Sequence, residues 1–222
     1  MNDIIHIKTI SELHQLLGLS APRHPLVSLY EDQKVDHRLI KEGGRFSSDL
    51  YFVMFKDCIS GAIGYGRNTY DFQSSTLVFL APHQVITLPP AEILEENEGW
   101  FLAFHPDLIR KSHLGTTIDE YTFFNYESNE ALHLSDEEQG YIKMVAEQIQ
   151  KEYSQNIDKH SQRLIISNLE LFLNYCSRFY DRQFYTRTNF NKDFITQFER
   201  ILKNYFNSTQ PSELGIPSIP YL

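Results

Sequence analysis

The stretch Leu50-Tyr51-Phe52-Val53-Met54-Phe55 is a short run of apolar and aromatic residues, and it decides the fold class. Three similar runs follow it: Thr76-Leu77-Val78-Phe79-Leu80, Gln84-Val85-Ile86-Thr87-Leu88 and Trp100-Phe101-Leu102-Ala103-Phe104. Short runs rich in aromatic and β-branched residues are typical of strands. These runs are apolar at both odd and even positions, which predicts strands that are covered on both faces.

Turn-forming residues separate the runs, for example Gly43-Gly44 and Pro89-Pro90, and a more polar candidate strand lies at Asp36–Lys41. Short strands at this density, without helices between them, indicate an antiparallel barrel or sandwich. The expected fold class is therefore mainly β with α, followed by a helical segment. The pattern leaves open which parity of side chains points inward.

The second half of the chain changes to a helical period. Ser135 and Glu138 have the spacing of a capping box, which predicts a helix that starts there. A second helix is expected from Asp158 to Tyr180, then a break at residues 181–189, and a third helix at about residues 190–206.

The second helix carries apolar side chains around more than one face, which predicts that it buries two surfaces. One barrel covers one side of a helix, so the other side is expected to form a homodimer; full burial within one chain is the alternative. Leu171→Glu or Leu173→Glu is expected to give a folded monomer. Five side chains are assigned to the dimer interface: Ile165, Leu169, Phe172, Leu173 and Phe179.

Charge and cysteine content narrow the classes of function. The 222 residues carry 29 acidic and 20 basic side chains, a net charge of -9. Residues 151–222 are slightly basic, with 9 basic and 7 acidic side chains, but the chain alone is not expected to bind DNA specifically. Two distant cysteines and the absence of a signal-peptide pattern predict a cytoplasmic protein with no membrane partner.

The sequence shows no strong catalytic motif. A cupin-type metal enzyme would need a His-x-His pair on one strand, and no two of the nine histidines have that spacing. No metal and no cofactor are therefore expected, and His83 and His105 are interpreted as hydrogen-bonded residues in loops or at strand ends.

Four residues are candidates for binding a small ligand. Arg38 would offer a cation inside a barrel, although a water-facing position on an edge strand is the alternative. Trp100 is the only tryptophan and is suited either to the core or to stacking on a ligand. Tyr51 and His83 complete the set.

Several short motifs occur in the order found in a known family. In the first half they are Tyr65, Tyr70-Asp71-Phe72, Leu77-x-Phe79-x-x-Pro82-x-Gln84 and Gly99-Trp100-x-Leu102-x-Phe104-His105-Pro106-Asp107. In the second half they are Phe194-x-x-x-Phe198, Phe206-Asn207 and Gly215-Ile216-Pro217-Ser218-Ile219. Together they resemble the cupin-like sensor domain and the following linker of AraC-family transcriptional regulators. Ser75 departs from the pattern, because the family often has glycine there.

The resemblance implies three parts: a cupin-like effector-binding jelly roll at residues 1–133, dimerisation helices at 134–185, and the leading helix of a helix-turn-helix domain at 186–222. It implies a homodimer that senses a small effector, with no enzymatic activity. The sequence stops as the first helix-turn-helix unit begins, so promoter DNA is expected as a partner only of a full-length protein. The alternatives are a cupin-type enzyme with an oligomerising helical tail, and a regulator whose barrel serves only for oligomerisation.

Overall fold

The computed structural model describes residues 4–36, 44–57, 62–65, 68–71, 75–87, 98–124, 131–155 and 158–206, with side chains after Gln183 left out of the description. The chain divides into two compact units, Met1–Tyr180 and Asp181–Leu222. The first unit is mixed α/β and holds two β-sheets together with the helices that follow them. The helices predicted at residues 134–180 thus belong to the same compact unit as the sheets.

The first sheet contains the N-terminal strand and has the order β1-β3-β8-β5-β6. Its strands are β1 (Ile4–Ile7), β3 (Arg45–Ser48), β8 (Ile86–Thr87), β5 (Ala62–Tyr65) and β6 (Asn68–Asp71). The other neighbours are antiparallel, but β1 and β3 run parallel, with His6 opposite Ser47. The expectation of a purely antiparallel fold is therefore wrong at this edge.

The second sheet has the order β10-β7-β4-β9-β2, and all of its neighbours are antiparallel. Its strands are β10 (Leu132–His133), β7 (Thr76–Leu80), β4 (Tyr51–Asp57), β9 (Glu98–Phe104) and β2 (Val27–Glu31). All five side chains of β7 are buried, as its uninterrupted apolar sequence predicts. Among the described residues no ladder joins the two sheets, so they face each other without closing a barrel.

Short helices close the ends of the sheets. Helix α1 (Ile10–Leu16) is capped by Thr9, whose hydroxyl accepts the N–H of Glu12 at 3.1 Å, and it buries Ile10 and Leu13 between the sheets. The remaining short elements are the 3-10 helix η1 (Asp32–Lys34), α3 (Pro106–Ile109), α4 (His113–Thr117), η3 (Ile118–Glu120) and η4 (Thr122–Phe124).

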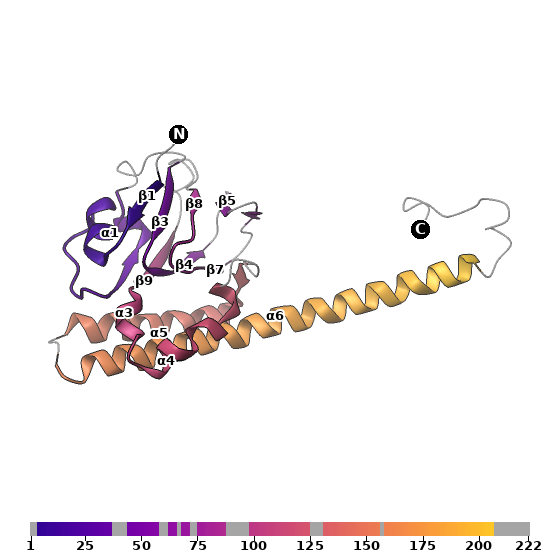
Figure 1. Ribbon diagram of the computed structural model, residues 1–222. Coiled ribbons are helices and arrows are strands. Elements are labelled where there is room, and N and C mark those ends of the chain that lie inside the picture. The colour runs from indigo at the N-terminus through magenta and orange to yellow at the C-terminus, as the bar shows by residue number, and fades with distance from the viewer. Residues whose placement is uncertain are drawn as a thin grey trace. The chain divides into compact units, whose positions relative to one another are not determined.

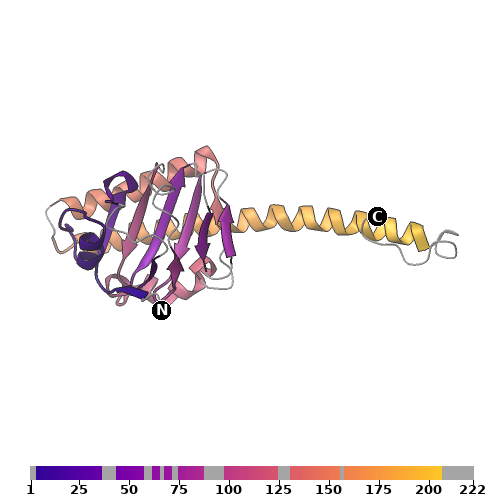
Figure 2. The ribbon, with the colours of Figure 1, turned by 90° about the horizontal axis from the view of Figure 1, so that it is seen from above.

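Two longer helices lie along the second sheet, on the face away from the first sheet (Figures 1 and 2). Helix α5 (Asp136–Ser154) begins with the predicted capping box of Ser135 and Glu138, both halves of which are formed. Helix α6 (Ser161–Phe206) lies beside it in the first unit, where Tyr141 of α5 stacks on Tyr175 of α6 at a ring-centroid distance of 5.8 Å. The first unit thus has three layers: a sheet, a second sheet, and helices.

Helix α6 is continuous from Ser161 to Phe206, so the break predicted at residues 181–189 is wrong. The range contains neither glycine nor proline, the residues that most strongly interrupt a helix. Its start agrees with the prediction, because the Asp158 carboxylate accepts the backbone N–H groups of His160 and Ser161 at 2.7 and 3.0 Å. Thr and Tyr lower the helix propensity of this stretch by less than about 1 kcal/mol each, and Arg favours a helix, so the run does not end it.

Tyr153 of α5 protects the open edge of β2. Its hydroxyl accepts the N–H of Leu29 at 2.8 Å and also contacts the Leu29 carbonyl oxygen at 3.2 Å. Burial raises the pKa of this phenol, so it stays protonated and able to donate. Exposed strand edges favour pairing with other chains, and the hydroxyl satisfies both groups of Leu29.

We expect Tyr153→Phe to lower the free energy of unfolding by about 1–3 kcal/mol, because the N–H of Leu29 loses its partner near the helix. Urea denaturation followed by circular dichroism measures the change. Tyr141→Phe is the matched control: its hydroxyl contacts only the exposed Glu137 carboxylate at 3.5 Å, so its stability should stay within about 0.5 kcal/mol of the wild type. Equal effects of the two substitutions would contradict the edge-protecting role.

Candidate functional site

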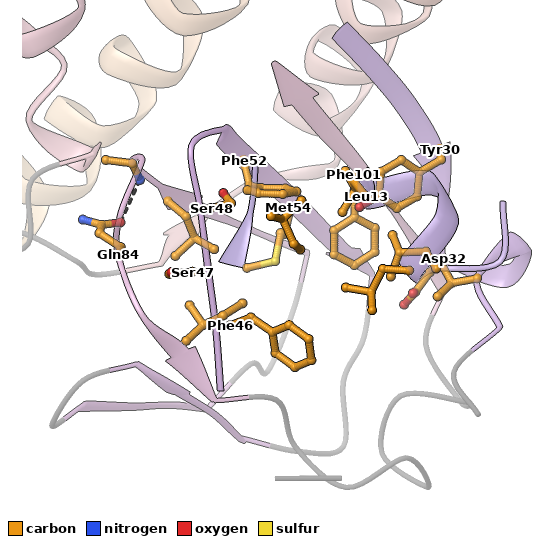
Figure 3. A pocket seen from close by; sticks show the side chains of 17 residues that line it. Leu13, Tyr30, Asp32, Phe46, Ser47, Ser48, Phe52, Met54, Gln84 and Phe101 are labelled. Carbon is orange, nitrogen blue, oxygen red and sulfur yellow. Dashed lines mark hydrogen bonds between the residues drawn. The ribbon is translucent and has the colours of Figure 1, made fainter. Parts of the chain in front are cut away.

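An apolar cavity of about 110 Å³ lies between the two sheets (Figure 3). Apolar cavities of about this order admit a small ring or a short alkyl chain. Strands of both sheets, helix α1 and the loop after β7 contribute to its wall. The apolar side chains of its lining include Leu13, Phe46, Phe52, Met54, Leu80 and Phe101.

Strand alternation explains which aromatic residues reach this cavity. On β4, Phe52 and Met54 point toward it, and Phe101 of β9 joins them because it lies opposite Met54 in the ladder. The next pair along the ladder, Phe55 and Trp100, points to the opposite face. The sequence left open which alternate side chains of these strands point inward. The structure shows that Phe52, Met54 and Phe101 do.

A buried ion pair lies at one end of the cavity. Lys56 continues the inward parity of β4, and its Nζ donates to Asp32 Oδ2 at 2.5 Å, with both side chains 1% exposed. The ammonium also lies 5.1 Å from the centre of the Phe101 ring, a cation–π distance. Burial and the Asp32 carboxylate both raise the pKa of Tyr30, so that phenol stays neutral. Asp32 and Lys56 are the two buried Asp, Glu, Lys or Arg side chains among the described residues.

Sequence reasoning missed this ion pair. One sequence feature pointed to it: Lys56 directly follows the apolar run at Leu50–Phe55. Its even position places its side chain on the same face of the strand as Phe52 and Met54. Asp32 comes from a distant 3-10 helix, and only the pairing of β2 with β9 brings it to the same place.

Gln84 lies at the other end of the cavity, where its side chain makes two hydrogen bonds with backbone groups. Its Oε1 accepts the N–H of Ala81 at 2.7 Å, and its Nε2 donates to the Phe124 carbonyl at 3.0 Å. Ser48, also in the wall, exchanges hydrogen bonds with the backbone of Leu50. These polar groups are held by backbone partners, so the cavity has a fixed polar rim and an apolar interior.

Of the predicted ligand-binding residues, Tyr51, His83 and Trp100 do not line this cavity. Tyr51 lies on the outward parity of β4 and stacks on Phe104 at 4.9 Å. His83 lies in the turn after β7 with its side chain 74% exposed. Arg38 lies outside the described residues. Tyr51 lies away from the cavity because the odd positions of β4 face the helices.

Trp100 also points away from the cavity, toward the helices. It stacks on Phe55 at 5.3 Å and meets Phe172 of α6 edge-on at 6.1 Å. It lines a second hollow of about 310 Å³ between β2, β9 and α5, whose wall includes Lys143 and Glu147. Trp100 therefore packs between the sheet and the helices, in agreement with its interpretation as a core residue.

The five side chains assigned to the dimer interface are buried within the single chain, so they cannot form the outer surface of the helix. Each is at most 5% exposed: Ile165, Leu169, Phe172, Leu173 and Phe179. They form the face of α6 that packs against the sheet and α5, and full intramolecular burial is the correct interpretation for them. Among the side chains of α6 up to Gln183, the large apolar ones that are exposed are Leu164 and Leu171, at 46% and 45%.

Two further residues behave as their sequence contexts predict. His105 ends β9 and caps α3, where its Nδ1 accepts the N–H of Asp107 at 3.1 Å. Cys176 is a buried free cysteine, and burial raises the pKa of its thiol well above the ordinary value. A thiol in this environment is a poor nucleophile, so it contributes packing.

No protein-family model matches the chain, and a search of the curated proteins finds no match. Within the part of the chain that the structure describes, no helix is both long enough and apolar enough to cross a membrane.

Proposed function

We propose that this chain is the effector-sensing and dimerising part of an AraC-family transcriptional regulator, with a cupin-like jelly roll as its sensor and a helix-turn-helix domain beyond it to contact promoter DNA. The observation that supports the proposal is that the two faces of the second sheet have different partners. One face lines the apolar cavity, and the opposite face packs against the helices.

The route from cavity to helix is short. Met54 and Phe101 face the cavity, and their ladder neighbours Phe55 and Trp100 face α6, where Trp100 contacts Phe172. A ligand that moves the inner side chains must also move the backbone that carries the outer ones, because cores are closely packed. Helix α6 then continues without interruption to Phe206. A ligand acts on this helix only if it binds one arrangement of the sheet better than another.

The cavity favours a small apolar ligand with a polar group near the rim. Its interior is aliphatic and aromatic, while Ser47 and Gln84 stand at one side and Asp32 at another. This mostly apolar interior supports a role in binding a small molecule. The second sheet's contact with α6 likewise supports a sensor over a barrel used only for oligomerisation.

Dimerisation is assigned to the exposed face of α6 rather than to the residues first predicted. Leu164 and Leu171 lie about two turns apart on one helix face and are both nearly half exposed. A second copy of the chain with a symmetric contact would cover this face, as in most homodimers.

We expect indole, used as a small apolar probe, to bind saturably to the chain, and Ile86→Phe to weaken this binding at least tenfold. Ile86 lines the cavity and is only partly buried, so a larger ring there fills the space that the probe needs. Isothermal titration measures both affinities. Lys143→Ala is the control, because it alters only the second hollow and should leave binding unchanged.

Hydrogen exchange then tests the coupling to the helix. Indole binding is expected to change the exchange of amides at residues 165–179 of α6, which do not touch the cavity. No saturable binding, or equal binding by wild type and Ile86→Phe, would overturn the cavity as the effector site. Binding that leaves α6 exchange unchanged would overturn its role as a sensor.

A further inference from the structure

Three side chains capable of binding a metal converge outside the cavity, at the edge of the first sheet. His6 comes from β1, Asp49 from the turn after β3, and His83 from the turn after β7. His6 Nε2 lies 2.8 Å from Asp49 Oδ1, and His83 Nδ1 lies 3.4 Å from the same oxygen. The two imidazole rings are stacked nearly parallel, with centroids 6.1 Å apart.

These separations fit the donor spacing of a transition-metal site. Zinc binds imidazole nitrogen and carboxylate oxygen at about 2.0–2.2 Å, so neighbouring donors in a tetrahedral or octahedral shell are about 2.9–3.5 Å apart. The two observed nitrogen–oxygen distances are close to that range, and all three donor atoms lie within 4.8 Å of one another. Small rotations of the side chains complete the geometry.

The partner of His6 fixes the ring orientation that a metal needs. His6 Nδ1 lies 2.7 Å from Ser47 Oγ, directly across the parallel β1–β3 register. When a metal binds Nε2, the ring proton lies on Nδ1 and is donated to Ser47, and the metal replaces the hydrogen bond between Nε2 and Asp49 Oδ1. Outer partners of this kind are typical of metal-binding histidines.

The backbone around the other two residues is held in a similar way. The N–H of Asp49 donates to the carbonyl of Ile7 at 2.9 Å, and the N–H of His83 donates to the carbonyl of Ser48 at 2.6 Å. His83 has φ of 66°, the one positive φ at a non-glycine residue in the described chain. A residue other than glycine is strained in this conformation, and such strain concentrates at functional positions. Histidine at this strained turn places its imidazole beside Asp49.

We propose that His6, Asp49 and His83 form a binding site for a divalent late first-row transition metal, with zinc as the first choice. Two imidazoles and one carboxylate suit zinc and its neighbours better than calcium or magnesium, which prefer oxygen donors. Three protein donors leave at least one position open, and the exposed His83 ring gives solvent access to it.

The site is adjacent to the rim of the cavity. Ile7 follows His6 in the cavity wall, Ser48 precedes Asp49, and Ala81 and Gln84 flank the turn that holds His83. A bound metal would therefore link the three segments that form this side of the rim. The lack of a His-x-His pair on one strand predicted no metal, whereas these three ligands come from three separate segments.

Zinc titration of the chain, after dialysis against a chelator, tests the proposal by calorimetry. We expect one zinc ion per chain, and His6→Ala and His83→Gly are each expected to weaken binding at least tenfold. His83→Gly removes a ligand and also relieves the positive φ, so it should fold at least as stably as the wild type. Loss of zinc binding by this variant therefore cannot be attributed to unfolding.

His113→Ala is the matched control, because His113 also pairs an exposed imidazole with a carboxylate, Glu170 at 3.3 Å, outside the cluster. It should bind zinc as the wild type does. The visible absorption of cobalt added in place of zinc should appear in the wild type and vanish in His83→Gly. Absence of zinc binding by the wild type, or binding that survives both His6→Ala and His83→Gly, would overturn the proposal.

Discussion

Asp32→Ala is expected to lower the free energy of unfolding by about 3–5 kcal/mol, among the largest effects of any single substitution in this chain. The substitution removes the carboxylate partner of Lys56. The side chain of Lys56 is 1% exposed, so its ammonium stays buried without a counter-ion. A buried charge without its counter-ion costs far more than the pair itself contributes, because neither water nor another charge replaces the lost partner. Urea denaturation followed by tryptophan fluorescence measures the loss.

Two comparisons separate this effect from ordinary loss of a contact. Glu31→Ala breaks the neighbouring ion pair with Lys34, whose side chains are 57% and 60% exposed, so it should cost at most about 1 kcal/mol. The double substitution Asp32→Leu with Lys56→Met removes both charges and should be more stable than Asp32→Ala alone. If Asp32→Ala and Glu31→Ala prove equally mild, the ion pair is not buried as described.

The strands of the second sheet were the part of the fold that the sequence predicted best. The run at residues 76–80 is β7 with the same bounds, and the runs that start at Leu50 and Trp100 overlap β4 and β9. All three are apolar on both faces because a sheet covers one side and helices cover the other. Their signal is local, which is why pattern reasoning identifies them.

The first sheet was largely missed, for a physical reason. Strand β1 is only four residues long and exposes Ile4 and Ile5, so it has no amphipathic pattern. Its position depends on parallel pairing with β3, a contact between distant segments. Hydrophobic periodicity carries information about neighbours in sequence and none about such pairings.

The candidate sites were missed for the same reason. The cavity wall depends on strand parity, which a strand apolar on both faces does not reveal. The cluster of His6, Asp49 and His83 depends on two turns meeting one edge strand. His83 was a candidate ligand-binding residue in the sequence, but its partners and most of the cavity wall carry no such signal, and only the fold brings these residues together.

Leu173→Glu is expected to destabilise the first unit by more than about 4 kcal/mol, whereas Leu171→Glu should leave it folded. Leu173 is fully buried on the face of α6 that packs inward, so the substitution removes its apolar contacts and buries a carboxylate. Leu171 lies on the outer face, where water solvates a new carboxylate. The two positions share residue type and helix, so burial is the main difference between them. Circular dichroism and urea denaturation compare the two variants.

The same pair of variants separates packing from dimerisation. If the exposed face of α6 joins two copies, Leu171→Glu is folded and its mass by light scattering falls to that of a monomer, because the contact would place two new carboxylates close to the symmetry axis. A Leu173→Glu variant with wild-type stability would contradict the inward orientation of that face. A wild type that is already monomeric at tens of micromolar would contradict the dimer. The outcome for Leu173 does not depend on the dimer, since its burial arises within one chain.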